Sequence, residues 1–309
     1  DLSFIQWQMT EILIRNSKRA YIAGDDDQAI FDWAGADTKR LGLIGGEREI
    51  LTQSYRVPRA VHHVADNLIS KINDRVKKDW NPKEEEGIVQ RHRMRFNNQI
   101  DLTDGSWLIL ARTNYVLDQI ADDLKYQGLF YEYKNRSSIS DRMIRAIQGW
   151  NNLKEGNEID VFAAQDIYYY MSGSGNIKHG HKEAIKTANE EIKYNYESLV
   201  ESHGLNTNIN TEWNIALDRI PESMQRYINA ALRRSSFNTS KNIKLSTIHA
   251  SKGGEADNVM VLKDLPRKAD LSLAQKRDDE RRVFYVATTR AKKSLHIIES
   301  QTNREFSEL

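Results

Sequence analysis

The spacing of apolar residues predicts helices and strands that alternate through the first part of the chain. Three amphipathic helices are predicted, from Phe4 to Leu13, from Pro58 to Ile72 and from Leu117 to Leu124, because their apolar residues recur three and four positions apart. Four short apolar runs predict strands, and these lie at residues 20–23, 49–53, 106–111 and 130–133. Strands that alternate with helices are typical of an α/β domain with a parallel sheet.

The pattern changes near Ser140 and changes back at Ile243. Between these points only helices are predicted, including a polar helix from Lys178 to Glu201. A further strand is predicted from Val259 to Leu262. A helical segment that interrupts strand–helix alternation is an insertion, so residues 140–240 are predicted to form a helical insertion within an α/β domain.

A polar stretch, residues 23–37, follows the first predicted strand. Because that strand is predicted to be buried and parallel, the stretch should lie at the carboxyl edge of a sheet, where α/β proteins bind ligands. Gln28 can donate and accept hydrogen bonds without charge, which suits contact with a phosphate or a positioned water. Phe31 and Trp33 offer a platform on which nucleic-acid bases stack. The alternative is an ordinary strand-to-helix turn with aromatic residues in the core.

Three further stretches occur in a fixed order with this one. Leu51–Arg56 precedes a predicted helix, Leu245–Glu255 precedes a predicted strand, and Glu280–Ala291 lies near the end. In this order and spacing the four stretches resemble motifs III, IV, V and VI of the UvrD/PcrA/Rep-like superfamily 1A DNA helicases. The resemblance implies a RecA-like parallel sheet of the P-loop NTPase type. It also implies that ATP and Mg²⁺ bind between two RecA-like domains and that the protein moves 3′ to 5′ on single-stranded DNA.

The resemblance implies a domain organisation as well. Residues 1–48 would be the C-terminal tail of a first RecA-like domain, residues 49–139 and 241–309 a second one, and residues 140–240 the insertion called 2B. Asp1 would be the last residue of a Walker B segment. A Walker A element is missing, because His181-Lys182 follows Gly175–Gly180 where Lys-Ser/Thr is required. We therefore expect the C-terminal portion of a longer protein, inactive alone, with the Mg²⁺ ligands upstream.

Five residues are expected on the nucleotide side. By resemblance, Arg56 and Arg290 reach the γ-phosphate, a role that suits the planar, always charged guanidinium. Gln28 would link the γ-phosphate to the DNA groove. Tyr55 would stack on adenine, and Glu255 would contact the ribose. Each residue taken alone also fits a structural role, such as a surface ion pair or a cap.

Seven residues are expected on the DNA side. They are, by resemblance and base-stacking chemistry, Phe31, Trp33, Arg112, Asn114, Thr247, His249 and Lys252. Trp33 is expected to be a stacking residue outside the core, because its segment is polar at the start and ends in Gly35. His249 has no second histidine or carboxylate at metal-ligand spacing, so it is interpreted as a DNA-side or core histidine. No metal ligand is predicted in this chain.

Several residues depart from the family pattern or carry no assigned role. Ala34 stands where the family often has arginine, which removes a polar contact beside Trp33. Gly254, Ala256 and Asp257 stand where the family usually has Leu and Phe around the motif V glutamate, so packing there should be looser or rearranged. Arg281 and Arg282 are interpreted as scaffold ion pairs.

Composition limits these interpretations. The 309 residues carry a net charge of +1, so DNA binding requires a local groove of Lys and Arg. No cysteine is present, which excludes disulfides and thiolate metal sites. No apolar segment approaches membrane-spanning length. These features predict a protein of the cytoplasm with no membrane partner, and the compact helical insertion would suit a bacterial or phage-infected cell.

The resemblance therefore implies part of an ATP-dependent DNA helicase that couples ATP hydrolysis to duplex unwinding, with DNA repair and DNA replication both open as its pathway. Its expected partners are single-stranded DNA, junctions of single- and double-stranded DNA, and the N-terminal RecA-like half of the same protein. Two alternatives stay open. One is a catalytically inactive helicase-like module that binds DNA or regulates, and the other is a helicase–nuclease subunit.

Overall fold

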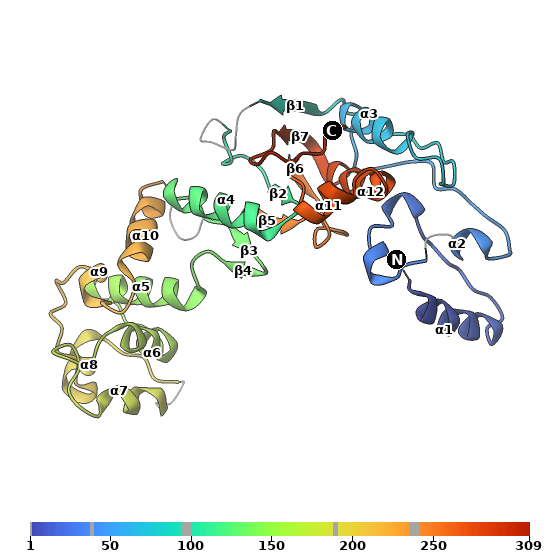
Figure 1. Cartoon of the computed structure of the whole chain (residues 1–309). Helices are drawn as coiled ribbons and strands as arrows, with labels where there is room; N and C mark the ends of the chain where they lie inside the picture. The colour runs from blue at the N-terminus through green and yellow to red at the C-terminus, as the bar shows by residue number, and fades with distance from the viewer. Residues whose placement is uncertain (1, 38–39, 94–99, 188–190, 235–241) are drawn as a thin grey trace. The chain divides into compact units, whose positions relative to one another are not determined.

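The computed structural model describes residues 2–37, 40–93, 100–187, 191–234 and 242–309. The chain divides into two compact units, each with its own hydrophobic core (Figure 1). Unit 1 comprises Asp1–Asp123 and Asn242–Leu309, and unit 2 comprises Leu124–Lys241. The predicted insertion, residues 140–240, lies within unit 2.

The described strands form one seven-stranded sheet in the order β1-β7-β6-β2-β5-β3-β4. The strands are β1 (Ile88–His92), β2 (Trp107–Ala111), β3 (Glu132–Tyr133), β4 (Arg136–Ser137), β5 (Ile243–Thr247), β6 (Ala256–Leu262) and β7 (Ala291–Ile298). The pairs β1·β7, β6·β7, β2·β6 and β2·β5 are parallel, and β3·β4 is antiparallel. Every residue of β2 is buried, as expected for a strand covered on both faces. The predicted α/β class with a parallel sheet is confirmed.

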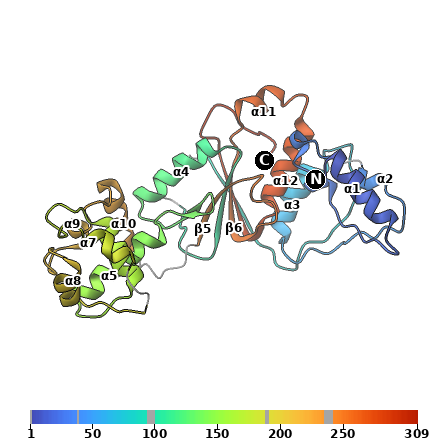
Figure 2. The same cartoon turned by 90° about the horizontal axis from the view of Figure 1, so that it is seen from below.

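The sheet of unit 1 is accompanied by helices with apolar faces. These elements are α1 (Phe4–Arg15), α2 (Arg40–Leu43), α3 (Arg59–Ile69), α4 (Asn114–Tyr126), α11 (Arg267–Ser272), α12 (Arg277–Thr288) and the 3₁₀ turns η1 (Asp26–Gln28) and η2 (Asp32–Ala34). Helix α4 crosses the boundary between the units. Helices α3 and α12 lie side by side (Figures 1 and 2) and share a core that includes Val61 and Phe284. The predicted helices from Pro58 and Leu117 are confirmed.

Unit 2 is mainly helical, as predicted. Its helices are α5 (Asp141–Lys154), α6 (Val161–Tyr170), α7 (His181–Ala184), η3 (Ile185–Thr187), α8 (Tyr196–His203), α9 (Trp213–Ala216) and α10 (Glu222–Arg234). The predicted helix from Lys178 to Glu201 is wrong as a single element. Gly180 has a φ of 86°, which α-helical backbone does not adopt, and Asn195 caps a separate helix by accepting a hydrogen bond from Ser198 N. Residues 188–190 lie outside the described part.

Two predicted strands are absent from the described residues. Residues 20–23 pair with no described strand, and Tyr21 is 89% exposed. Within residues 49–53 only Gln53 forms a bridge, to Asn81. A strand requires a hydrogen-bonded neighbour, which a short apolar run does not by itself provide. The sequence predicted that a preceding strand places the polar stretch at residues 23–37. That prediction is wrong, because residues 20–23 form no strand with the described residues.

Helix α1 is amphipathic as predicted, but its apolar face is exposed. The exposed apolar side chains are Phe4, Ile5, Met9, Ile12 and Leu13, and Trp7 is the one buried residue of the helix. A cluster of exposed apolar side chains of this kind is typical of an interaction surface. No helix in the described ranges is both long and apolar enough to cross a membrane.

Two histidines from neighbouring strands stack inside the sheet layer of unit 1. His92 Nε2 lies 3.1 Å from His296 Nδ1, and the ring planes differ by 13°. The ring centroid of Trp107 lies 5.0 Å from that of His296, and the Oγ of Ser294 lies 3.1 Å from His296 Nε2. Burial, and then the neighbouring His92, lower the pKa of His296 to about 4. The folded protein therefore favours the neutral form of His296.

We expect acid to destabilise unit 1 through His296. Because its folded pKa lies below the ordinary value of about 6.5, its stabilising effect is complete above that pH and is lost as the pH falls towards 4. Urea unfolding should show a free-energy loss between about pH 6.5 and pH 4.5, of which on the order of 2 kcal/mol disappears in His296→Gln. The exposed His63, replaced by Gln, is the control. Equal pH dependence in all three proteins would contradict this assignment.

Candidate functional site

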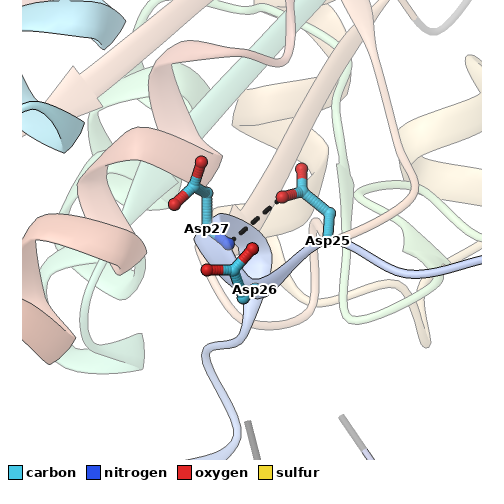
Figure 3. Close-up of side chains that lie close together, drawn as sticks. All are labelled: Asp25, Asp26 and Asp27. Atoms are coloured by element: carbon cyan, nitrogen blue, oxygen red, sulfur yellow. Dashed lines mark hydrogen bonds between the residues drawn. The ribbon is translucent and has the colours of Figure 1, made fainter. Parts of the chain in front are cut away.

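The segment at residues 25–37 is shaped by short-range hydrogen bonds. Asp25 caps the turn η1, and its carboxylate accepts a hydrogen bond from Asp27 N, drawn as the dashed line in Figure 3. Gly35 ends η2 with a φ of 80°, a left-handed conformation that glycine adopts at no steric penalty. The local sequence therefore gives two tight turns, and contacts with the rest of unit 1 decide where these turns lie.

Three adjacent carboxylates fix the segment to the region after α3. Oxygens of Asp25, Asp26 and Asp27 lie within 4.8 Å of one another, close enough to hold a cation (Figure 3). Two basic side chains occupy them. Arg75 binds Asp27 through both Nε, at 2.7 Å, and Nη2, while Lys78 Nζ contacts all three carboxylates. We therefore explain this cluster by internal ion pairs.

This ionic clamp, which we define as Arg75 and Lys78 with Asp25, Asp26 and Asp27, is well buried at its centre. The side chain of Asp27 is 2% exposed. The hydrogen bonds to Asp27 raise the pKa of Arg75, and although burial opposes the charged form, the carboxylates raise the pKa of Lys78. Sequence reasoning missed both basic residues, because a basic pair three positions apart in a polar loop resembles an ordinary solvated surface.

The scaffold roles predicted for the two arginines of motif VI are confirmed. Arg282 donates to the backbone oxygens of Asp26 and Asp74, at 3.1 and 2.8 Å. Arg281 pairs with Glu308 at 2.9 Å and with Asp278. Both side chains hold segments together inside unit 1.

Gln28 lies at the centre of a hydrogen-bond chain. Its Nε2 donates to Asp25 Oδ2 at 2.6 Å, and its Oε1 accepts from Arg290 Nη2 at 3.1 Å. Its backbone oxygen accepts from Lys252 Nζ at 2.8 Å. The carboxylate can only accept and the guanidinium can only donate, so the two partners fix the orientation of the amide. Gln28 thus joins a residue after α12 to a residue after β5.

Two arginines gather at the amino ends of β6 and β7. Ala256 pairs with Ala291, which brings the preceding residues, Glu255 and Arg290, to the same end of the sheet. Arg290 is 2% exposed and donates from Nε to Val286 O at 2.9 Å. Burial, and then the nearby Arg56, lower the pKa of Arg290 to about 10. Two cationic side chains thus lie close together at one end of two strands.

The second arginine is incompletely paired. Arg56 Nη1 lies 3.8 Å from a Glu255 carboxylate oxygen, which is a loose ion pair, and Lys292 shares that carboxylate. The Nε of Arg56 is buried and has no hydrogen-bond partner among the described residues. Burial lowers the pKa of Arg56 even though Glu255 opposes the change. One exposed carboxylate therefore pairs with two cations, Arg56 and Lys292, and the buried Arg290 lies near Arg56, an arrangement that suits an anion. Tyr55, beside Arg56, is 88% exposed.

The aromatic residues lie at the carboxyl ends of β2 and β5. Ala111 pairs with Thr247, so Arg112 and His249, which follow these strands, come together. Arg112 Nη1 lies 3.2 Å from His249 Nδ1, and His249 meets the Phe31 ring edge-on with centroids 5.8 Å apart. The pairing of β2 with β5 therefore places His249 next to Phe31, the aromatic residue of the motif III segment.

Trp33 extends this arrangement to the surface. It is 74% exposed, and its ring centroid lies 6.2 Å from that of Phe31. Lys252 Nζ lies 5.7 Å from the Phe31 ring centroid. The prediction that Trp33 is outside the core is confirmed, whereas its contact with DNA stays a prediction. Phe31 and Trp33 are called the aromatic pair below.

The remaining predicted DNA-side residues are placed differently. Asn114 is exposed at the start of α4, and Thr247 Oγ1 accepts from Ala250 N at 3.3 Å at the end of β5. Arg112 binds Glu280 through Nε and Nη2, at 2.9 and 2.7 Å. The Arg112 guanidinium therefore already binds protein groups, and its contact with DNA stays a prediction.

The residues around the motif V glutamate make defined contacts in unit 1, while the expected difference in packing from the family stays a prediction. Ala256 is buried in the core of unit 1. Asp257 accepts from Ser106 N at 3.3 Å and pairs with Lys293 at 3.4 Å. A polar tether to the start of β2 therefore stands at a position where the family usually has an apolar side chain.

A mostly parallel sheet of this type, with functional side chains at the ends of its strands, defines an α/β protein of the RecA-like class. Two known protein domains match separate parts of this chain. The UvrD-like helicase C-terminal domain matches residues 183–302, and the UvrD/REP helicase N-terminal domain matches residues 1–44. Both matched regions are thus similar to UvrD-like helicase domains, and the resemblance to UvrD-like helicases is confirmed.

Two curated relatives support the same assignment. Each is named a probable DNA helicase II homolog, one from Mycoplasma genitalium and one from Mycoplasma pneumoniae, and each is 22% identical to this chain. The alignments cover 96% of this chain, but 53% and 52% of the two relatives. The chain thus spans about half the length of these relatives.

We expect the ionic clamp to be a major source of stability in unit 1. Asp27→Asn should lower the free energy of unfolding by about 3–5 kcal/mol, because it leaves the buried Arg75 without its charged partner. Glu222→Gln, which breaks the exposed pair with Arg226 on α10, is the matched control and should change stability by less than about 0.5 kcal/mol. Urea unfolding measures both. Similar small losses in the two variants would show that the clamp contributes little.

Proposed function

We propose that this chain is part of an ATP-dependent DNA helicase that moves 3′ to 5′ on single-stranded DNA and couples ATP hydrolysis to duplex unwinding. The observation that carries the proposal is the position of Gln28. Its side chain binds Arg290, and its backbone oxygen binds Lys252, which lies beside Phe31. Gln28 therefore joins the arginine cluster, which we define as Arg56 and Arg290, to the aromatic pair. Coupling of ATP hydrolysis to movement on DNA requires a connection of this kind.

The arginine cluster fits a nucleotide phosphate. Arg56 and Arg290 supply two guanidinium groups, and the buried Nε of Arg56 has no hydrogen-bond partner among the described residues. Buried donors without partners are rare, so such a donor is a reason to expect a ligand. We propose that both arginines hold phosphate oxygens of ATP, that exposed Tyr55 stacks on adenine, and that Glu255 contacts the ribose.

Phosphoryl transfer depends mainly on positioning the reactants and on neutralising the charge of the transferred phosphoryl group. ATP supplies that group, and Mg²⁺ bound to ATP supplies part of the neutralising charge. In the proposed reaction the two arginines neutralise negative charge, and Gln28 responds to it. A phosphate that binds Arg290 competes with the Gln28 amide oxygen for the guanidinium. The Mg²⁺ ligands are proposed to come from the remainder of the first RecA-like domain.

The aromatic pair fits single-stranded DNA. Bases of any sequence stack on exposed aromatic rings, and Trp33 offers such a ring. Lys252 adds a positive charge beside it. We propose that Asn114 and Thr247 contact the DNA backbone near the same ends of β2 and β5. With a net charge of only +1, the chain depends on this local arrangement and not on overall attraction.

The exposed face of α1 fits a further protein partner. Residues 1–44 match the UvrD/REP helicase N-terminal domain, and the curated relatives are about twice as long as this chain. We propose that the rest of a first RecA-like domain covers this apolar face. Burial at roughly 25 cal/mol per Å² would make the contact strongly favourable.

Replacing either arginine should abolish efficient ATP hydrolysis. In the complete gene product that carries this chain, Arg56→Ala and Arg290→Lys should each reduce DNA-stimulated turnover by about a thousandfold, the usual scale for such an arginine. Phosphate release measures turnover. Arg290 changes to Lys because its buried side chain also holds the backbone of α12.

The control for this experiment is Arg59→Ala, an exposed arginine at the start of α3 that should leave turnover unchanged. Affinity for single-stranded DNA without nucleotide should stay the same in all variants. Equal loss of DNA affinity and turnover would mean that the arginines act on the DNA side.

Replacing Trp33 should weaken DNA binding without unfolding the protein. Trp33→Ala should reduce affinity for single-stranded DNA by about 1–3 kcal/mol at fixed salt, because a stacking surface is lost. The unfolding midpoint should hardly change, since the indole is mostly exposed. A core tryptophan such as Trp150 would instead lose about 3–5 kcal/mol of stability on truncation.

Fluorescence anisotropy with an oligo-dT strand and urea unfolding separate these outcomes. Tyr126→Ala is the matched control, because Tyr126 is an exposed aromatic residue at the far end of α4. Unchanged affinity in Trp33→Ala, with normal binding by the unaltered chain, would remove Trp33 from the DNA site.

A further inference from the structure

A line of polar side chains runs from α12 to the aromatic pair. Glu280 of α12 binds Arg112, Arg112 contacts His249, and His249 meets Phe31. We propose that Arg112 is a positioning residue that holds His249 edge-on against Phe31 and thereby sets the aromatic pair for base stacking. This inference rests on the proposed DNA-binding function of the pair.

The first contact in the line is rigid. Arg112 and Glu280 form a two-point ion pair, and their side chains are only 15% and 7% exposed. A bidentate pair of this kind fixes the plane of the guanidinium, which lysine in its place would not do. The remaining nitrogen, Nη1, is thereby directed at His249 Nδ1. Arg112 thus transfers the position of α12 to the histidine.

The second contact determines the orientation of the imidazole. Arginine has only donors, so His249 Nδ1 must accept the hydrogen bond and the ring proton must reside on Nε2. The ring also forms a hydrogen bond with the backbone of Ile30. Burial, and then Arg112, lower the pKa of His249 to about 4, while Glu280 and the Ile30 bond oppose the change. At neutral pH His249 is therefore uncharged and held at two points.

The third contact determines where Phe31 lies. The His249 and Phe31 ring planes meet at 68°, an edge-to-face arrangement that aromatic rings prefer. Lys252 lies on the Phe31 ring as well, so Phe31 is confined by two neighbours and Trp33 lies beside it. Loss of Arg112 would free the imidazole to rotate and remove one of these neighbours.

Two roles for Arg112 give different DNA-binding behaviour. A residue that contacts phosphate contributes to the salt dependence of binding, so its loss reduces the salt slope by about one. A positioning residue acts through the aromatic pair, so its loss lowers affinity without changing the slope. Its effect should also vanish once Trp33 has been removed, because interacting residues are not additive.

The test uses the complete gene product that carries this chain and an oligo-dT strand of about 15 nucleotides, long enough for a short stacking site. Affinity and its salt slope are measured for Arg112→Met, Arg112→Lys, Trp33→Ala and the double variant of Arg112→Met with Trp33→Ala. Arg59→Met is the control. We expect about five- to tenfold weaker binding in Arg112→Met, little rescue by Lys, an unchanged slope, and no further loss in the double variant.

A second set of measurements follows His249 directly by NMR of labelled histidine, with His249→Gln used for assignment. In Arg112→Met the pKa of His249 should rise from about 4, and the chemical-shift effect of the Phe31 ring should decrease. Because Met leaves Glu280 buried and unpaired, Arg112→Met combined with Glu280→Gln provides a neutral pair that is able to fold. That pair should show the same loss of DNA affinity.

Full affinity in the neutral pair would mean that Arg112 only balances the charge of Glu280, and would overturn the inference. A reduced salt slope with additive losses would do the same in favour of a direct phosphate contact. If the unaltered protein does not bind single-stranded DNA, the proposed function fails. The NMR measurement then decides the inference alone, and an unchanged His249 ring environment in Arg112→Met would reject it.

Discussion

The position of the motif III segment depends on buried charge pairing. No described strand holds residues 20–23, so the turns that follow are placed by the ion pair of Asp27 with Arg75 and by Lys78. Surface pairs of this type contribute little, but a buried two-point pair is costly to break because it would leave a charge without water or a partner. The clamp therefore determines where Gln28 and Phe31 lie.

That placement gives one short segment two neighbours of different chemistry. Gln28 binds Arg290 at the amino ends of the strands, and three residues later Phe31 packs against His249 near the carboxyl ends. Helix α12 spans the same two regions, because Glu280 near its start binds Arg112 and Arg290 follows its end. The segment and the helix thus form two parallel connections between the proposed nucleotide and DNA sites.

The parallel sheet provides the frame for both sites. The register that pairs Ala111 with Thr247 brings Arg112 to His249 across 137 positions of sequence. The register that pairs Ala256 with Ala291 similarly brings Glu255 and Arg290 together. In a parallel sheet the residues that follow neighbouring strands meet at one edge, and the residues that precede them meet at the opposite edge. Strand order therefore decides which motifs share a site. Apolar burial on both faces of β2 makes that order stable.

Features that depend on local pattern could be predicted from the sequence. The apolar runs predicted β2 and β6, the helical stripes predicted α3 and α4, and the four motifs in order indicated the resemblance to UvrD-like helicases. Which polar side chains meet depends on how distant segments fold together. Arg75 and Asp27 are 48 positions apart, and Arg112 and Glu280 are 168 apart. Periodicity reports which residues are buried against a core, but a hydrogen-bond partner is chosen by register and packing between distant segments. For the same reason the apolar run at residues 20–23 did not become a strand, since pairing needs a neighbour that no local pattern contains.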